Sequence, residues 1–222
     1  MAEVFDFKKK FKHLYQPPAT PGILQIPPMQ YIMFEGKGDP NQPDGEYSKA
    51  VEILYGLSYA IKMSHKNGHA PRDYFEYSVP PLEGLWWMRD ETMFDPIKKS
   101  ELCFISMIRQ PDFVTEVFFE WAVSEIKRKK KDLDPSSARL VKLDEGLCVQ
   151  VMHHGPYATE PETVARMAEY VRENGYFDAI GDVLSDGQIR RHHEIYLTDP
   201  RKCSPEKMRT VLRHPVKMAA KA

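Results

Sequence analysis

The side chains best suited to chemistry lie near the end of the chain, in the run HHEIYLT at residues 192–198. In a strand, alternation places His193, Ile195 and Leu197 on one face and His192, Glu194 and Tyr196 on the other. Glu194 then lies between an imidazole and a phenol, and a carboxylate in mid-strand is costly to bury without a partner. Glu194 is therefore a candidate proton acceptor or countercharge in a ligand site, with Tyr196 beside it. The same pattern also fits an edge strand whose polar face meets water.

Aromatic residues are the second unusual feature of the chain. Trp86 and Trp87 are adjacent, so in a strand one of them points away from the core. The residues expected to line an aromatic cage near Glu194 are Tyr55, Trp86, Trp87, Phe104, Trp121 and Tyr157. Such a cage suits planar aromatic or cationic small molecules, because stacking and cation–π contacts provide affinity. Each ring taken singly is more simply explained as ordinary core.

The histidines do not predict a metal site. The pairs His153-His154 and His192-His193 consist of neighbours that face opposite ways in a strand, and no cysteine or aspartate at ligand spacing supports them. The sequence also contains no glycine-rich phosphate loop and no G-x-S-x-G nucleophile motif. We therefore expect neither a metal nor another cofactor.

Composition and charge describe an ordinary globular protein of 222 residues, with 42% hydrophobic and 28% charged residues. The net charge of -1 provides no overall attraction to nucleic acid or to an anionic membrane, and the basic run at 127–131 fits a solvated helix end. Three cysteines without close spacing favour a reducing compartment. The charged N-terminus lacks the apolar stretch of a signal peptide. We expect a cytoplasmic protein with no nucleic-acid or membrane partner, whose oligomeric state the sequence leaves open.

Two segments that must position these residues repeat the same order of elements. Residues 29–36 and 147–155 are strand-like runs that end in glycine, and each is followed by a loop and an amphipathic helix, at about 44–65 and 160–173. Thr159 and Glu162 have the spacing of a capping box at the start of the second helix. The repeated order indicates an internal duplication of a strand–helix–strand–strand unit.

Further elements complete an α+β pattern with an antiparallel sheet and helices on one face. Strands are expected at 74–79, 83–88, 101–109 and 139–143, the last in a hairpin with the next strand about residues 144–146. Asp112 is expected to cap a helix that reaches Lys131, and Ser204 a short closing helix. The apolar stripe expected on the longer helix consists of Val114, Val117, Phe118, Trp121 and Ala122.

Four runs resemble the GyrI-like small-molecule-binding proteins of the stand-alone type. They are PPLEGLWWM at 80–88, MIRQPDFVTEV at 107–117, HHGPYATEPETV at 153–164 and HHEIYLTDPRKCSPEKM at 192–208. The resemblance implies duplicated β-α-β-β units of SHS2-like type, related by a pseudo-twofold axis, with a ligand cavity between them. It places an N-terminal arm and linker at 1–28 and the GyrI-like domain at 29–222. In related multidrug-responsive regulators an acid on the equivalent late strand engages cationic drugs, and Glu194 occupies that place, but the regulators' helix-turn-helix is missing.

The LEGLWW run and the supply of aromatic residues resemble one subfamily, the cyclopropanoid cyclopropyl hydrolases. That resemblance implies hydrolysis of the cyclopropane ring of DNA-alkylating xenobiotics, with Glu194 activating a water and Tyr196 or Tyr157 donating to a carbonyl oxygen. The alternative is a module that binds, sequesters or senses a small molecule, with Glu194 as countercharge only. A third hypothesis, inhibition of a topoisomerase by protein contact, is suggested by the family name alone.

Overall fold

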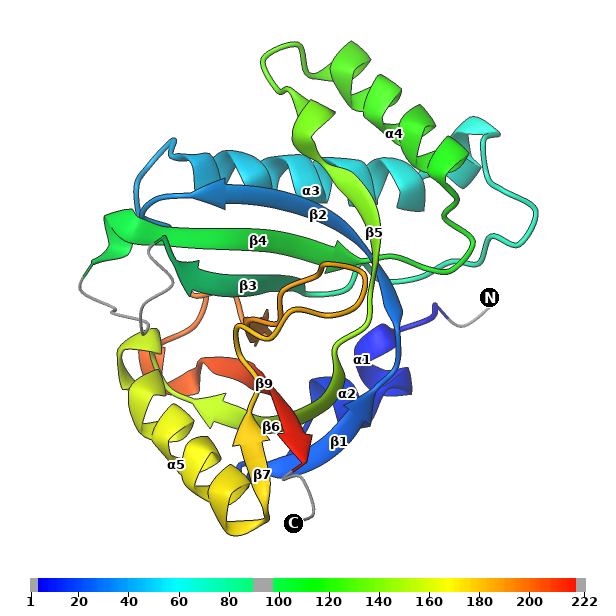
Figure 1. The fold of residues 1–222 in the computed structure, drawn as a ribbon. Coiled ribbons are helices and arrows are strands. Elements are labelled where there is room, and N and C mark those ends of the chain that lie inside the picture. Colours follow the sequence, from blue (N-terminus) through cyan, green and yellow to red (C-terminus); the bar gives the residue numbers. More distant parts are fainter. Residues whose placement is uncertain (1–3, 90–97, 219–222) are drawn as a thin grey trace.

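The computed structural model describes residues 4–89 and 98–218 of the chain (Figure 1). Its strands are β1 (Gly22–Ile26), β2 (Met29–Lys37), β3 (Leu82–Met88), β4 (Leu102–Arg109), β5 (Arg139–Leu143), β6 (Gly146–His154), β7 (Tyr176–Asp178), β8 (His192–Tyr196) and β9 (Arg209–Met218). Its α-helices are α1 (Phe7–Lys10), α2 (Lys12–Tyr15), α3 (Glu46–Lys62), α4 (Glu116–Lys129) and α5 (Glu160–Glu173). Short 3₁₀ turns occupy Ser64–Asn67, Lys99–Glu101, Pro135–Ser137, Tyr157–Thr159 and Pro205–Lys207.

The order of the strands is symmetric about the middle of the sheet. The order is β1-β6-β9-β8-β3-β4-β2-β5, with antiparallel pairing throughout, and β7 is added on β9. Exchanging β1 with β5, β2 with β6, β3 with β8 and β4 with β9 returns the same order reversed. The predicted duplication is therefore confirmed, with one unit β2-α3-β3-β4, the other β6-α5-β8-β9, and the pseudo-twofold axis between β3 and β8.

The two units pair directly through β3 and β8, and the outermost strands β1 and β5 connect them a second time. This second connection curls the sheet. The register runs without a slip from Gly22 opposite Gln150 to Ile26 opposite Gly146, and onward from Met29 opposite Leu143 to Met33 opposite Arg139. The segments 22–33 and 139–150 thus form one bent antiparallel ribbon. Each unit receives its outermost strand from the chain segment that precedes the other unit.

The two faces of the curled sheet pack against different elements. On the outer face, α3 packs on β2 and β4, α4 packs on α3, and α5 packs on β6 and β7 (Figure 1). The long helices thus lie on one face, as predicted, whereas α1 and α2 of the N-terminal arm cover the inner face. In β2, Ile32 and Phe34 belong to the core under α3, while Tyr31 and Met33 point inward. This alternation is what a strand buried on both faces requires.

A buried ionic cluster of Glu83, Glu145, His193 and Arg213 lies on the inner face. His193 Nε2 is 3.0 Å from Glu83 Oε2, and His193 Nδ1 is 2.8 Å from Glu145 Oε1. Arg213 Nη1 is 2.6 Å from Glu145 Oε2. Carboxylates only accept hydrogen bonds, so both ring nitrogens of His193 donate and the ring is an imidazolium. Two cations therefore balance two anions in the interior.

The N-terminal arm closes this ionic cluster. The Tyr15 hydroxyl lies 3.3 Å from Glu83, and the carbonyl oxygen of Leu14 accepts from Arg213 at 3.3 Å. Tyr15 and Leu14 are both buried. The arm and linker expected at residues 1–28 thus contain two short helices, α1 and α2, and the strand β1.

Several predicted elements differ in the structure. Residues 74–79 do not form a regular strand, because their pairing is limited to a single bridge between Tyr77 and Phe5 of the arm. The hairpin predicted about residues 144–146 is wrong, since β5 pairs with β2 while β6 pairs with β1 and β9. The ten-residue strand β9 was not predicted.

Helix starts also differ from the sequence patterns. Thr115, and not Asp112, caps α4 by accepting a hydrogen bond from the Phe118 amide. The buried side of α4 consists of Phe119, Ala122, Val123 and Ile126, whereas Val117 of the predicted stripe is 82% exposed. At α5 the capping box is not formed, since the Thr159 side chain accepts no hydrogen bond from the first turn of the helix and its hydroxyl donates to the Pro156 carbonyl oxygen. Within residues 4–89 and 98–218, none of the helices is long and apolar enough to cross a membrane.

Candidate functional site

The candidate site lies on the outer face where the two units meet, at β3 and β8. Gly84 is paired with Glu194 across this junction, and Trp86 with His192. A Cβ at Gly84 would lie 2.7 Å from Trp86 Nε1 and 3.0 Å from the Tyr196 hydroxyl oxygen. The missing side chain at Gly84 is therefore what lets the Trp86 and Tyr196 side chains meet across the sheet. The alternation expected for residues 192–197 is present, with Glu194 on this face and Ile195 in the inner core.

Aromatic rings surround the junction. Trp86 Nε1 donates to the Tyr196 hydroxyl at 2.7 Å. Tyr47, at the start of α3, packs its ring 5.5 Å from that of Trp86 and 5.2 Å from that of Phe104. Tyr157, just before α5, meets the Tyr196 ring edge to face at 5.9 Å. Rings from both units thus contact one another around the pseudo-twofold axis.

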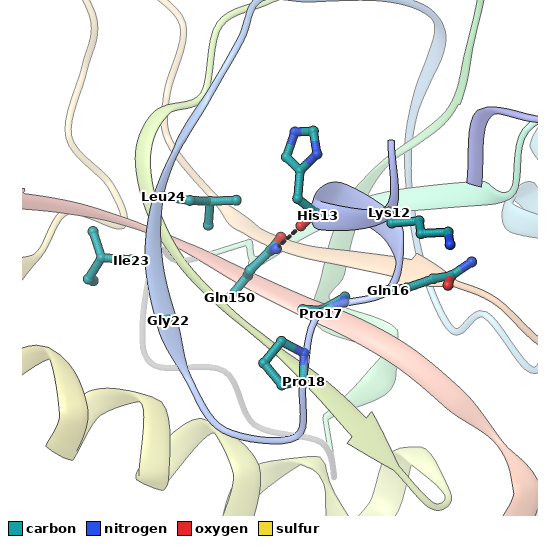
Figure 2. A pocket seen from close by; sticks show the side chains of 9 residues that line it. All are labelled: Lys12, His13, Gln16, Pro17, Pro18, Gly22, Ile23, Leu24 and Gln150. Carbon is teal, nitrogen blue, oxygen red and sulfur yellow. Dashed lines mark hydrogen bonds between the residues drawn. The ribbon is translucent and has the colours of Figure 1, made fainter. Parts of the chain in front are cut away.

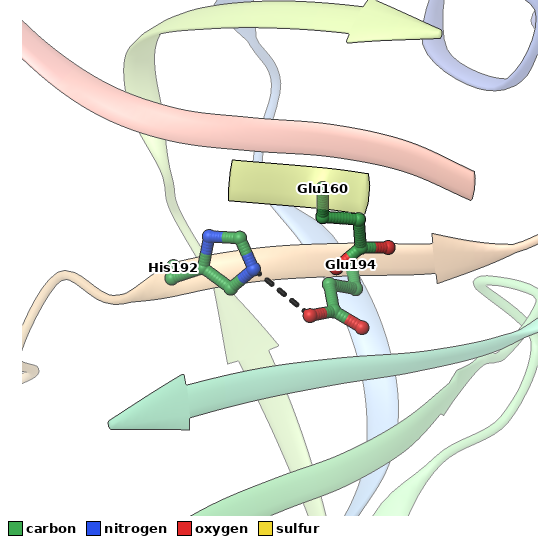
Figure 3. A group of neighbouring side chains, drawn as sticks. All are labelled: Glu160, His192 and Glu194. Carbon is green, nitrogen blue, oxygen red and sulfur yellow. Dashed lines mark hydrogen bonds and ion pairs between the residues drawn. The ribbon is translucent and has the colours of Figure 1, made fainter. Parts of the chain in front are cut away.

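A pair of buried carboxyl groups lies beside these rings (Figure 3). Glu160, the first residue of α5, and Glu194 of β8 are each 7% exposed. Side-chain ligand atoms of Glu160, Glu194 and His192 all lie within 4.8 Å of one another. Burial, together with the negative charge of Glu194 and a hydrogen bond to it, raises the pKa of Glu160 to about 10. The pair therefore carries one proton at neutral pH, because two carboxylate charges this close together would repel each other.

Histidines flank the carboxyl pair on its other side. His192 Nε2 lies 3.0 Å from Glu194 Oε1, and His192 Nδ1 lies 2.6 Å from Nε2 of His214 on β9. Burial and the neighbouring His192 hold the pKa of His214 well below its usual value, so its ring is neutral.

The tyrosines of the site remain neutral donors. Burial raises the pKa of Tyr196 well above its usual value, and the charge of Glu194 raises it further. The same two causes, in the same order, raise the pKa of Tyr47 and of Tyr157. Three neutral hydroxyl groups around one carboxylate can stabilise negative charge that develops on a bound molecule.

The structure brings together most of the predicted site residues. Glu194, Tyr196, Trp86, Phe104 and Tyr157 belong to one contacting group. Of the two adjacent tryptophans, Trp86 is the one on this face.

Three other predicted residues lie outside that contacting group. Tyr55 is two turns beyond Tyr47 on α3, where it stacks on Tyr59 with ring centroids 6.4 Å apart. Trp87 points to the opposite face and lies under the Arg191 guanidinium, 4.5 Å from its ring centroid. Trp121 stacks on Phe118 of its own helix at 5.1 Å.

Glu160, Tyr47 and His214 belong to the site but were not predicted from the sequence. Acids are common in the first turn of a helix because they complement its dipole, so Glu160 gave no separate signal. Its one distinction is its place in the run HHGPYATE, which the family resemblance already included. Tyr47 lies in the amphipathic helix expected at about 44–65, where a ring has an ordinary explanation as core, and His214 lies in β9, the strand that was not predicted.

Two surface hollows lie at the N-terminal arm. One of about 250 Å³ is found between α2 and β1, where Gln150 donates to the His13 carbonyl oxygen (Figure 2). The other, of about 410 Å³, is lined mainly by phenylalanines, with the Arg109 guanidinium over the rings of Phe7 and Phe11. Neither is lined by Glu194 or Trp86. At the candidate site Tyr157, 41% exposed, is the outermost ring.

Comparison with known sequences and structures agrees with this architecture. The profile of the GyrI-like small molecule binding domain matches residues 19–217, so the chain belongs to the GyrI-like family. A search of curated proteins returns no match.

Solved structures from Listeria innocua are similar along nearly the whole chain. One, described as an uncharacterized conserved protein, is 45% identical with a TM-score of 0.85, and the match covers 96% of this chain and all of that one. Another, described as a hydrolase, is 44% identical with a TM-score of 0.86 and covers 97% of this chain and all of that one. The C-terminal domain of EcmrR, at 11% identity and a TM-score of 0.50 over 90% of this chain and 98% of that one, shares the fold alone.

Proposed function

We propose that this protein binds planar aromatic electrophiles at the β3–β8 junction and hydrolyses the cyclopropane ring of cyclopropanoid DNA-alkylating agents, which would detoxify them. The observation that carries the proposal is the carboxyl pair of Glu160 and Glu194, buried among the rings of Trp86, Tyr196 and Tyr157. A base, a neutral acid and aromatic surfaces thus lie in one place. The name hydrolase, given to a relative 44% identical over nearly the full chain, supports the reaction class.

The proposed reaction uses Glu194 as the base. Glu194 takes a proton from a water molecule as the water oxygen bonds to the strained ring carbon. The cyclopropane C–C bond breaks, and its electron pair moves through the conjugated system to the carbonyl oxygen of the substrate. The hydroxyl of Tyr196 or Tyr157 donates a hydrogen bond to that oxygen, and the proton that Glu194 took from water is passed on to the oxygen as the product leaves, which restores the Glu194 carboxylate. A positioned base contributes about 10²–10⁴-fold to such a rate.

Binding requires the aromatic group to open. The Trp86 and Tyr196 side chains touch, so a planar ligand must separate rings that now contact one another. Tyr157 is the exposed member of the group and follows Gly155, whose φ of +127° favours glycine. The proposed entry is therefore by displacement of Tyr157.

The second candidate function is binding without catalysis, in which the protein sequesters or senses a cationic aromatic molecule. The family description, a small-molecule-binding domain, favours it equally. In that case the anionic carboxyl pair is only a countercharge.

The substitution Glu194→Gln separates the two functions. It keeps the size of the side chain and removes the proton acceptor. We expect an enzyme to lose turnover of a cyclopropanoid substrate by about 10²-fold or more and to keep its affinity for a neutral planar ligand. A pure binding protein should lose affinity for cationic ligands only. The measurement is mass spectrometry of substrate incubated with substoichiometric protein.

Glu162→Gln is the matched control, since Glu162 is an exposed glutamate in the same first turn as Glu160. Its turnover should equal that of the wild type. Hydrolysis at the wild-type rate by Glu194→Gln would show that Glu194 is not the base. If the wild-type protein takes up one ligand per site and then stops, it is a binding protein and not an enzyme.

A further inference from the structure

The two carboxyl groups of the site have unequal surroundings. Glu194 accepts from His192, and its charge lies near enough to the Tyr196 hydroxyl to raise the pKa of that phenol. The Tyr196 oxygen already accepts from Trp86, an indole that can only donate, so the hydroxyl proton is available to Glu194. Among the described residues, by contrast, Oε1 of Glu160 is buried without a hydrogen-bond partner. A negative charge is therefore less costly on Glu194 than on Glu160.

The donor on His192 depends on a residue outside the carboxyl pair. With one proton on its ring, His192 can donate from Nε2 to Glu194 only when its Nδ1 accepts. The atom that faces Nδ1 is Nε2 of His214, at 2.6 Å. His214 is buried on β9, the strand next to Glu194, where it stays neutral and can supply one N–H. The chain of donors then runs from His214 to His192 to Glu194.

We propose that His214, acting through His192, is a positioning residue that fixes the negative charge on Glu194 and the shared proton on Glu160. The opposite arrangement puts the proton on Glu194, turns His192 into an acceptor at Nε2, and leaves an anion on Glu160 with its unpartnered oxygen. The assignment of base and acid within the pair is thus set from a neighbouring strand. Its kinetic consequence rests on the proposed function, whereas the protonation pattern is a property of the resting protein.

Nuclear magnetic resonance of the full chain tests the protonation pattern without any substrate. With ¹³C in the glutamate side-chain carboxyl groups, we expect a neutral carboxylic acid signal at neutral pH. This signal should vanish in Glu160→Gln and persist in Glu194→Gln. With ¹⁵N in the histidine rings, His192 should carry its proton on Nε2. A neutral signal that vanishes in Glu194→Gln and persists in Glu160→Gln would overturn the proposal.

Two variants of His214 separate positioning from packing. His214→Leu fills the space and removes the donor, so the His192 proton should distribute over both ring nitrogens and the two carboxyl signals should move toward each other. His214→Gln offers an amide N–H in place of the imidazole N–H and should keep the wild-type spectrum. His154→Leu, an exposed histidine on β6, is the matched control and should change neither signal. Circular dichroism establishes that each variant is folded.

The kinetic readout is a split between kcat and KM. We expect His214→Leu to lower kcat by about 10-fold or more, which is part of the rate acceleration that a positioned base provides. KM should stay unchanged within about 2-fold. His214→Gln should restore most of kcat. Wild-type spectra and wild-type kcat in His214→Leu would overturn the proposal. If wild-type protein does not hydrolyse a cyclopropanoid, the proposed function fails, and the spectra still decide whether His214 sets the protonation pattern.

Discussion

At the scale of single residues, Trp86 and Trp87 show how strand alternation assigns two identical side chains to different environments. Trp86 contacts Tyr196, Tyr47 and Phe104 at the candidate site. Trp87 lies on the other face against the Arg191 guanidinium. Substitution of Trp87 is therefore a matched control for substitution of Trp86.

We expect Trp86→Ala to weaken binding of a planar cyclopropanoid by about 1–3 kcal/mol, because stacking and apolar burial are lost. Affinity is best measured by calorimetry in the Glu194→Gln background, where the ligand is not consumed. Trp87→Ala should bind as its parent does. Equal affinities for both variants, with circular dichroism unchanged, would remove Trp86 from the site.

A second prediction at this scale concerns metal ions. Glu160, His192 and Glu194 are residue types that bind transition metals, and their ligand atoms lie close together. The His192 nitrogen nearest Glu194 already lies at hydrogen-bond distance from it, and the pair of acids carries a proton that a metal would have to displace. We expect dialysis against EDTA to leave both turnover and Tm unchanged. Loss of either, restored by one divalent ion, would contradict this prediction.

At the scale of elements, the approach of β3 to β8 depends on Gly84. We expect Gly84→Ala to destabilise the protein by about 1–3 kcal/mol, because the new methyl group overlaps Trp86 Nε1 and crowds the Tyr196 hydroxyl. Turnover should fall with stability, since the Trp86–Tyr196 hydrogen bond must break. Urea denaturation measures the first effect.

Gly22→Ala is the matched control for Gly84→Ala. Gly22 is also a strand glycine, at the start of β1, and a Cβ there would meet nothing within 4 Å. Its free energy of unfolding should be close to the wild-type value. If the two alanine variants are equally stable, the close approach at Gly84 is not structurally required.

Elements with a clear apolar run or one clear apolar face could be predicted from the sequence, and those with mixed faces could not. The strands β2, β3, β4, β5, β6 and β8, and α5, match their predicted ranges closely. β9 has no simple alternation, because Arg213 and His214 are buried on its two faces and Pro215 lies within it. Residues 74–79 have strand-like composition, but the arm offers them only one bridge.

The candidate site could be predicted only where residue type and strand pattern coincide. Glu194 is an acid in mid-strand, which is rare enough to notice, and Trp86 belongs to an unusual pair. Glu160 and Tyr47 come from helix starts, where acids and rings have ordinary explanations. Their contact with Glu194 and Trp86 arises from packing between elements, which local pattern does not encode.

At the scale of the whole molecule, the inner ionic cluster should make stability depend on pH in two directions. Burial opposes charge on Glu145, but the nearby charges of His193 and Arg213 outweigh it and lower its pKa to about 2. Burial likewise opposes charge on His193, but Glu145 and Glu83 outweigh it and raise its pKa above the usual value of 6.5. The Glu145 contribution is therefore lost as pH falls from about 4.5 toward 2, and the His193 contribution as pH rises through its raised pKa.

We expect the contribution of this ionic cluster to the free energy of unfolding to be largest between about pH 5 and 6.5, where the Glu145 and His193 contributions are both present. Glu145→Gln should lower stability by about 3–5 kcal/mol, because Arg213 loses its partner in the interior, and should flatten the acid side of the profile. Chemical denaturation across pH measures both. An acid side that is as steep in Glu145→Gln as in the wild type would show that other groups cause it.

The bent ribbon of residues 22–33 and 139–150 has a consequence for how the chain is made. Among the residues that the structure describes, the edge of β2 that faces away from β4 pairs with β5, and β1 pairs with β6, more than a hundred residues later in synthesis. Until the ribosome has released residue 150, the edges of β1 and β2 that form this ribbon are not fully paired, and the edge of β3 that pairs with β8 stays unpaired until residue 196 has been released. Those edges are a hazard for pairing between nascent chains. Chaperone demand should therefore peak midway through translation and fall once the second unit pairs with the first.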